Sequence, residues 1–218
     1  KFDELAAAVE GQIEDSKVLR LHLGILPLFG SQRLFPRLPE LRKQHPRLHI
    51  DFDTSPQLEN RVGDTLDAAI ILAKRPDPAF HSFRLDHNRV YAFTSKALAA
   101  EIGANPDKEV LSRQTFLIHT ELPDSFIAWK QAIGMPDLEP AAIDHYDSGQ
   151  LILEAAANGL GIAIMHDDHF HRSHDKRLAK LFDVEVESPY SYWFICRPHA
   201  LEVRAVRIFH DWLVQAGL

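Results

Sequence analysis

Four histidines and two aspartates lie within the short segment His166–His174. His166 and His169 are three residues apart, so on a helix both imidazoles would project from one face. Imidazole and carboxylate groups suit zinc or a similar metal ion. The spacing matches no established ligand motif such as H-E-x-x-H, and the alternative is a polar loop with a short exposed helix. We therefore predict no metal site and no cofactor.

Residue patterns for nucleophilic or phosphate chemistry are absent from the sequence. There is no G-x-S-x-G elbow and no P-loop, and Gly159-Leu-Gly161 lacks the third glycine of a dinucleotide fingerprint. Cys196 is the single cysteine, which excludes an intramolecular disulfide and fits a reducing compartment. The apolar residues before it favour a buried structural thiol over a redox sensor. We predict that no residue is catalytic.

Hydroxyl side chains recur in four segments that follow predicted strands, namely residues 26–31, 53–56, 120–124 and 146–150. In parallel α/β sheets such loops lie at the ligand-binding edge, and helix N-termini there offer N–H groups and partial positive charge. The candidate binding residues are the hydroxyls of Ser31, Thr54, Ser55, Thr120 and Ser148 and an apolar wall of Pro27, Leu28 and Phe29. For each hydroxyl, the alternative is a cap of its own helix or turn. None of these loops contains an arginine, so a doubly charged acid is not specially favoured.

The segment Leu151–Met165 indicates how such a loop is positioned, because it has the pattern of a helix, a glycine turn and a short strand. Asp147 and Ser148 are N-cap residue types directly before the helix. Gly159 falls where a helix end needs a left-handed conformation. The uninterrupted apolar run Ile162–Met165 predicts a strand that is covered on both faces, as in a parallel α/β sheet.

Similar patterns along the chain predict two α/β lobes, one before and one after about residue 95. The predicted strands cover residues 19–25, 48–53, 67–72, 89–94, 115–119, 142–146, 162–165 and 192–196. Pro36 and Pro39 predict a break near residue 35 in the helix after the first strand, because an interior proline costs about 3 kcal/mol. Asp124 is a candidate cap for a later helix. A terminal helix should bury one face that carries Val203, Val206, Phe209 and Leu213.

Five segments occur in an order that is typical of a known family. They are Leu21–Phe29, Leu34–Leu38, His45–Leu48, Leu66–Ile70 and Ala155–Ala163. As an ordered set within residues 17–216, they resemble the effector-binding domain of LysR-type transcriptional regulators. The short spacing from Ile50 to Asp67 resembles the branch that contains the glycine-cleavage activator and the β-lactamase regulators.

The resemblance implies an α/β fold of two Rossmann-like lobes joined by two crossover segments, which is the architecture of type 2 periplasmic binding proteins. It places residues 17–94 and 197–218 in lobe I and residues 95–196 in lobe II. Residues 1–16 resemble the remnant of the family's linker helix, and an ordinary surface helix is the alternative. Apolar residues recur there at helical spacing, at Phe2, Leu5, Val9 and Ile13.

The resemblance also implies a function. A small-molecule effector would bind between the lobes and modulate DNA binding by an N-terminal winged helix-turn-helix that these residues do not include. The family pattern further implies a dimer or tetramer, in which a helix near residues 31–45 packs on a partner's helix near residues 148–158. The apolar candidates for that contact are Leu34, Leu41, Leu151 and Ile152.

Composition and charge limit the remaining possibilities. The chain is 45% hydrophobic and 25% charged, as soluble globular proteins are. A net charge of -7 with dispersed lysines and arginines argues against this chain binding DNA phosphates by itself. No apolar run approaches the roughly 18 residues that span a bilayer, so we expect a cytoplasmic protein without membrane contact. Two other functions remain open: a solute-binding protein of an uptake system and an α/β enzyme.

Overall fold

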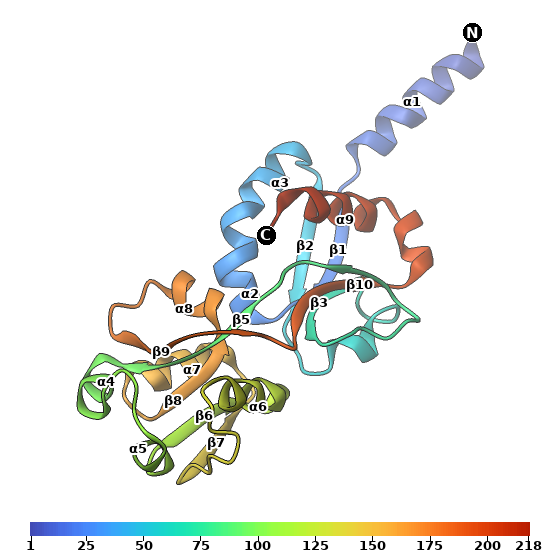
Figure 1. The fold of residues 1–218 in the computed structure, drawn as a ribbon. Helices are drawn as coiled ribbons and strands as arrows, with labels where there is room; N and C mark the ends of the chain where they lie inside the picture. The colour runs from blue at the N-terminus through green and yellow to red at the C-terminus, as the bar shows by residue number, and fades with distance from the viewer.

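The computed structural model describes the backbone of residues 1–218 and the side chains of residues 1–9 and 17–218. It shows two α/β lobes connected by two crossing segments, with the helix α1 (Phe2–Ser16) projecting away from lobe I (Figure 1). The expected two-lobe α/β fold is therefore confirmed. In the described part of the chain, no helix is long and apolar enough to cross a membrane.

Lobe I is built on a five-stranded sheet in the order β2-β1-β3-β10-β4. Its strands are β1 (Leu19–Gly24), β2 (Leu48–Asp53), β3 (Ala68–Ala73), β4 (His81–Arg84) and β10 (Ser191–Cys196). Its helices are α2 (Pro27–Phe29), α3 (Leu38–Gln44) and α9 (Arg204–Ala216), with short 3-10 turns at Leu58–Arg61 and Pro198–Glu202. The first three strands pair in parallel, and β10 is antiparallel to β3 and β4.

Lobe II contains a second five-stranded sheet in the order β7-β6-β8-β5-β9. Its strands are β5 (Arg89–Ser95), β6 (Thr115–His119), β7 (Ala142–Tyr146), β8 (Ile162–His166) and β9 (Leu178–Glu187). Its helices are α4 (Lys96–Ile102), α5 (Lys108–Ser112), α6 (Pro123–Ala132), α7 (Gly149–Ala157) and α8 (Asp167–Ser173). Here β6, β7 and β8 are parallel, and β5 is antiparallel to both β8 and β9.

The sheet pairing corrects the expected lobe boundaries, 17–94 plus 197–218 for lobe I and 95–196 for lobe II. Strand β5 was assigned to lobe I but lies in the sheet of lobe II, and β10 lies in the sheet of lobe I. The chain therefore crosses just before β5 and just before β10. The crossings run side by side, since Leu85 N donates to Tyr192 O at 2.9 Å and Ser188 N donates to Asn88 O at 2.9 Å. An apolar strand has the same sequence pattern in either sheet, so the boundary could not be seen in the residues.

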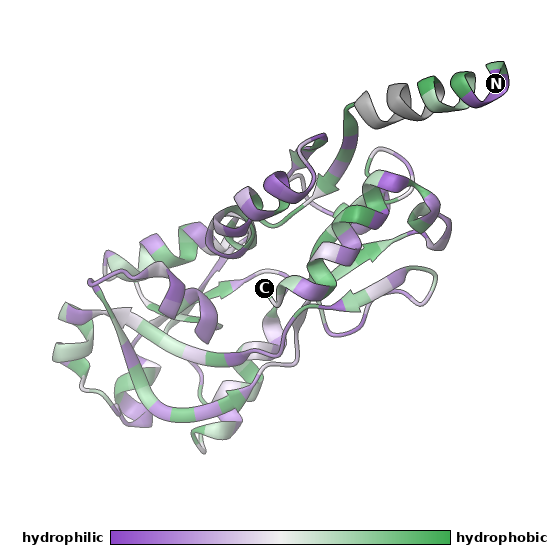
Figure 2. Ribbon diagram, turned by 90° about the horizontal axis from the view of Figure 1, so that it is seen from above, coloured by the Kyte–Doolittle hydropathy of each residue, from purple (hydrophilic) through white to green (hydrophobic). Residues whose placement is uncertain are grey.

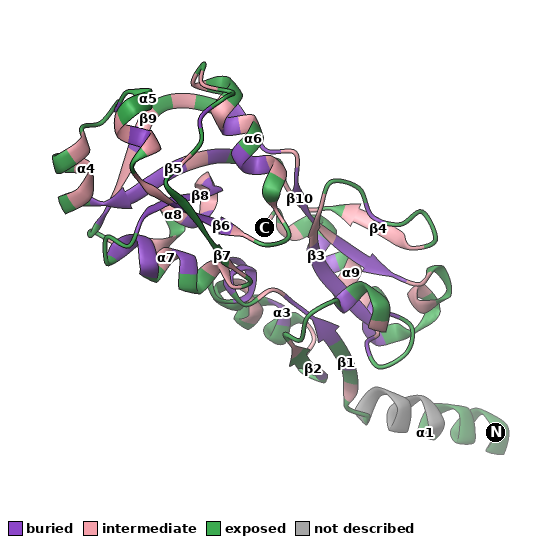
Figure 3. Ribbon diagram, turned by 90° about the horizontal axis from the view of Figure 1, so that it is seen from below, coloured by how far each residue is buried: buried purple, intermediate pink, exposed green. Residues whose placement is uncertain are grey.

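The helix–turn–strand unit of lobe II forms as the sequence predicts. Every residue of β8 is buried, and Figure 3 shows the central strands as the most buried part of each lobe. Gly159 has a φ of 75°, which is the left-handed conformation expected after α7. Gly161 permits a close approach, because a Cβ atom there would lie 2.5 Å from the carbonyl oxygen of Thr115. The glycines thus allow α7 to turn directly into a covered strand.

The predicted helical break near residue 35 is also present. A π-helical turn at Gly30–Leu34 and a 3-10 turn at Phe35–Arg37 separate α2 from α3, and Pro36 lies in the 3-10 turn. The irregular turns place Leu34 and Leu41 in the core of lobe I, where they are 0% and 2% exposed. Both were expected on a dimer surface, and so was Ile152, which is 0% exposed. These three expectations are wrong, because the side chains already pack within one chain.

Two further local expectations are corrected. Asp124 does not cap α6, whose N-cap is Leu122, and instead forms an ion pair with Lys74 of lobe I. Helix α9 buries the expected Val206, Phe209 and Leu213, but Val203 precedes the helix and is 53% exposed.

The described part of α1 carries hydrophobic and hydrophilic residues (Figure 2), and its apolar residues face solvent. Phe2, Leu5 and Val9 are 94%, 67% and 48% exposed, whereas the side chain of Ile13 lies outside the described residues.

Candidate functional site

A cavity of about 360 Å³ lies between the two lobes. Lobe I contributes the segment after β1, the loop after β2, the end of β3 and Tyr192 of β10. Lobe II contributes the loops after β6 and β7, the start of α7, the end of β8 and His169 of α8. The cavity thus lies where the parallel strands of both sheets end, which is the usual ligand position in α/β proteins.

Five of the eight predicted binding residues line this cavity, namely Pro27, Leu28, Thr54, Ser55 and Ser148. Phe29 does not, because it is 0% exposed in the core of lobe I with its ring 4.7 Å from that of Tyr192. Ser31 is exposed and donates to Leu28 O at 3.4 Å. Thr120 is exposed in the turn after β6, where its N–H donates to Tyr146 O at 2.8 Å. The Ser31 hydroxyl therefore serves its own turn, which was the stated alternative, whereas the Thr120 bond involves only its backbone.

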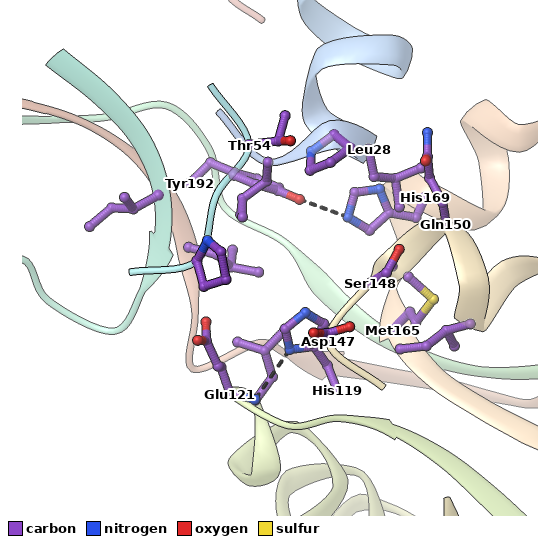
Figure 4. A pocket seen from close by; sticks show the side chains of 18 of the residues that line it. Leu28, Thr54, His119, Glu121, Asp147, Ser148, Gln150, Met165, His169 and Tyr192 are labelled. Atoms are coloured by element: carbon purple, nitrogen blue, oxygen red, sulfur yellow. Dashed lines mark hydrogen bonds between the residues drawn. The ribbon is translucent and has the colours of Figure 1, made fainter. Parts of the chain in front are cut away.

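A hydrogen-bonded chain of three side chains connects the lobes at one end of the cavity. Gln32 Oε1 lies 2.9 Å from His169 Nδ1, and Tyr192 Oη lies 2.9 Å from His169 Nε2, as Figure 4 shows for the second bond. Gln32 Nε2 donates to His169 O at 3.4 Å, which fixes the amide oxygen toward the imidazole. His169 therefore donates through Nδ1, and its Nε2 accepts the hydroxyl hydrogen of Tyr192.

Burial sets the protonation states in this network. The pKa of His169 lies well below its usual 6.5, chiefly because burial penalises the charged ring and also because His166 and Arg33 are near. Burial also raises the pKa of Tyr192 above its usual 10. At neutral pH the network is therefore uncharged, and each hydrogen has one acceptor.

A buried ion-pair network lies behind Tyr192. Arg33 is 4% exposed, pairs with Asp86 of the crossing segment, and has its Nε 3.4 Å from Asp168 Oδ2 of α8. Asp86 Oδ1 also accepts the Tyr192 N–H at 2.9 Å. The guanidinium thus meets two carboxylates, so its charge is compensated where water is excluded. Like the histidine network, this one joins elements of both lobes.

The opposite end of the cavity is acidic (Figure 4). Glu121 and Asp147 come from the loops after β6 and β7, and His119 ends β6 beside them. Glu121 N donates to His119 Nδ1 at 3.2 Å. Burial lowers the pKa of His119, although Glu121 and Asp147 oppose the shift. A neutral His119 leaves the two carboxylate charges uncompensated.

The binding candidates missed from the sequence are mainly aromatic and imidazole groups, namely His119, His166, His169 and Tyr192. The histidine-rich segment was noticed, and α8 is the short helix that was expected after a buried strand. It is only partly exposed, however, because His169 of α8 is 4% exposed, and His166 at the end of β8 is 3% exposed. Among residues 1–9 and 17–218, no three groups of ligand type gather around a possible metal position. Cys196 is buried, as expected, and burial raises its pKa to about 11.

The fold and cavity define a two-lobed α/β domain with a small-molecule-sized site between its lobes. A family model described as the LysR substrate binding domain matches residues 15–217, and the chain therefore belongs to this family. This confirms the expected effector-binding domain of a LysR-type transcriptional regulator, with type 2 periplasmic-binding-protein architecture.

Relatives from the expected branch are similar to the chain. The HTH-type transcriptional activator AmpR of Enterobacter cloacae is 28% identical over 219 residues, which cover 98% of this chain and 72% of that protein. The glycine cleavage system transcriptional activator of Escherichia coli is 21% identical over 216 residues, covering 98% and 70%. The effector domain of AmpR from Pseudomonas aeruginosa superimposes with a TM-score of 0.76 at 26% identity, covering 91% and 94%. These relatives are regulators, which does not favour the solute-binding or enzyme alternatives.

Proposed function

We propose that the cavity is the effector site and that a small molecule bound there changes how the two lobes are held. The observation that carries this proposal is that both lobes form the cavity wall while the Gln32–His169–Tyr192 chain joins the lobes at one end of the cavity. A ligand that contacts both lobes stabilises one lobe arrangement over others by its difference in affinity for them. The effector-binding residues are Pro27, Leu28, Thr54, Ser55 and Ser148 from the sequence, with Tyr192 and His169 added by the geometry.

The output of this site would be a change in DNA binding by a helix-turn-helix domain outside these 218 residues. The names of the relatives support this proposal, because they are HTH-type regulators of which this chain spans about 72%. The chain itself carries a net charge of -7, which disfavours direct contact with DNA phosphates. The regulator would act in the cytoplasm, without a catalytic step in this domain.

Self-association as a dimer or tetramer is part of the same proposal. Leu151 at the start of α7 is 57% exposed, and Phe35 of the helical segment in lobe I is 46% exposed. Phe35 contacts Phe52 of the edge strand β2 with ring centroids 5.1 Å apart, so the two rings form a small apolar surface. A symmetric contact between this surface and α7 of a second copy would cover apolar side chains that water otherwise faces.

A small-molecule screen by thermal shift tests the proposal, followed by calorimetry on each compound found. Tyr192→Phe should weaken binding of a true effector several-fold, because it leaves His169 Nε2 without its donor and loosens the cavity wall. Tyr91→Phe is the matched control, since the Tyr91 hydroxyl contacts the exposed His171 away from the cavity. If every compound binds Tyr192→Phe and Tyr91→Phe with the same affinity as the unaltered protein, this result would contradict an effector site here.

A further inference from the structure

Two buried polar atoms in the cavity wall have no hydrogen-bond partner among the described residues. Ser125 of α6 and His166 of β8 are 4% and 3% exposed, and both line the cavity. Ser125 Oγ and His166 Nδ1 make no hydrogen bond with any described residue. Buried polar atoms are paired in the great majority of cases, and an unpaired one costs about 1–3 kcal/mol. Because both residues line the cavity, a molecule bound there is a possible source of the missing partners.

The hydrogen-bond network of His166 shows which kind of partner is missing. Its Nε2 lies 2.7 Å from Ser188 Oγ, which already accepts the N–H of Tyr190 at 3.0 Å. The hydroxyl hydrogen of Ser188 has no other acceptor among the hydrogen bonds of the described residues, so it is donated to Nε2. The remaining hydrogen of the neutral ring is then on Nδ1. His166 therefore presents an N–H donor that needs an acceptor oxygen.

The charge of the cavity restricts the molecule that brings this oxygen. Among the described residues, the lining includes no lysine or arginine, but it includes Glu59, Glu121 and Asp147. None of these three carboxylates forms an ion pair with a described residue, whereas many other carboxylates do. The buried Arg33 behind Tyr192 is already held by Asp86 and Asp168. An anion would therefore meet repulsion and no compensating cation.

The histidines of the wall do not change this balance at neutral pH. Burial lowers the pKa of His166 to about 4, although Asp86, Asp167 and Asp168 oppose the shift and Arg33 adds to it. The pKa of His169 and that of His119 are lowered for the same main reason. The cavity is thus acidic at the Glu121 end and neutral along the wall that holds His166.

We propose that the effector is a small cation that also carries a neutral acceptor oxygen. Its ammonium or guanidinium group lies against Glu121 and Asp147, and an amide or hydroxyl oxygen accepts from His166 Nδ1 and Ser125. The inference rests on the proposed effector site and adds the chemical class of the ligand. Apolar wall residues, among them Leu28, Ile164 and Met165, accommodate a short aliphatic part of the same molecule.

L-leucinamide is a suitable probe, because it combines an ammonium group, an amide oxygen and a branched aliphatic side chain. N-acetyl-L-leucine is the matched anion, with the same side chain and an amide but a carboxylate in place of the ammonium group. Protein-observed NMR titration to about 10 mM detects affinities in the millimolar range. Leucinamide should bind with chemical-shift changes at the cavity, and N-acetylleucine should bind at least about tenfold more weakly.

Variants of the wall separate charge from hydrogen bonding. Glu121→Gln and Asp147→Asn should each weaken leucinamide binding about two- to fivefold, as loss of a partly exposed ion pair does. Glu139→Gln is the control, because Glu139 is an exposed carboxylate outside the cavity. Ser125→Ala should weaken leucinamide binding about two- to tenfold. It should leave the melting temperature of the free protein unchanged or higher, because it removes an unpaired buried hydroxyl rather than a bond.

The outcomes are distinct. Absence of leucinamide binding, equal binding of N-acetylleucine, or unaltered affinity in both carboxylate variants overturns the inference. If the screen instead finds anions whose affinity depends on Tyr192, the effector site stands and the cationic ligand class is wrong. If no compound depends on any residue of the cavity, the effector site itself is wrong. A clear loss of stability in Ser125→Ala would show that its hydroxyl has a structural partner instead.

Discussion

Acidification should destabilise this domain well above the pH at which its carboxylates protonate. His166 and His169 are buried and uncharged in the folded protein, and the pKa of His166 is lowered to about 4. In the unfolded chain, a histidine binds its proton near pH 6.5. Between these values the unfolded state holds more protons than the folded state. The free energy of unfolding therefore has its full value above about pH 6.5 and decreases as the pH drops toward 4.

The magnitude follows from proton linkage. Each proton that only the unfolded state binds changes the free energy of unfolding by about 1.4 kcal/mol for each pH unit. Between about pH 6.5 and pH 5, His166 alone should remove about 2 kcal/mol, and His169 acts in the same direction. For a domain of this size, 2 kcal/mol lowers the melting temperature by about 4–8 °C.

Urea unfolding at about pH 7, 6 and 5 measures the effect directly. The range ends near pH 5 because Asp53 and Asp175, whose pKa values are lowered, lose their stabilising contributions only below about pH 4. His166→Gln should flatten the pH dependence, whereas His145→Gln on the exposed strand β7 should not. The same free energy of unfolding at all three pH values would refute neutral burial of the two histidines.

Three further outcomes are expected. Ser148→Ala removes the side-chain oxygen that accepts the Leu151 N–H at 3.4 Å. Calorimetry should show a folded protein whose effector affinity is several-fold lower and whose stability is reduced by about 0.5–2 kcal/mol. A lowered melting temperature with unchanged effector affinity would mean that Ser148 is a helix cap only. Gly161→Ala places a Cβ atom 2.5 Å from Thr115 O, so urea unfolding should show the free energy of unfolding lowered by about 1–3 kcal/mol. Gly30→Ala should leave this free energy nearly unchanged, because its Cβ atom would meet nothing closer than 3.4 Å. Leu151→Arg should shift the mass measured by light scattering toward that of the monomer, because Leu151 lies in the proposed interface. Val203→Arg, at a similarly exposed residue elsewhere, should not. An unaltered protein that is monomeric at every concentration would contradict the proposed interface.

The sequence predicts the local units well because their determinants are close together in the chain. One short segment of the chain contains a helix cap, a turn and a covered strand, at Ser148, Gly159 and Ile162–Met165 respectively. Strand β9 was missed because it is irregular: Phe182 has a φ of 60° and the pairing with β5 shifts register between Val90 and Ala92. Strand β4 was missed for another reason, since it is a four-residue strand at the sheet edge and only partly buried.

The site was harder to predict because its determinants are far apart. Nothing near His169 in sequence shows that its ring nitrogens meet Gln32, 137 residues away, and Tyr192, 23 residues away. Spacing alone suggested either a metal ligand or a solvated side chain. The structure shows a third role, in which both ring nitrogens of a lobe II imidazole form hydrogen bonds with side chains of lobe I. Opening the lobes must break both bonds or replace them, at about 1–3 kcal/mol for each buried group left unpaired. The same three residues that escaped prediction are therefore the ones through which a ligand in the cavity can change the position of one lobe against the other.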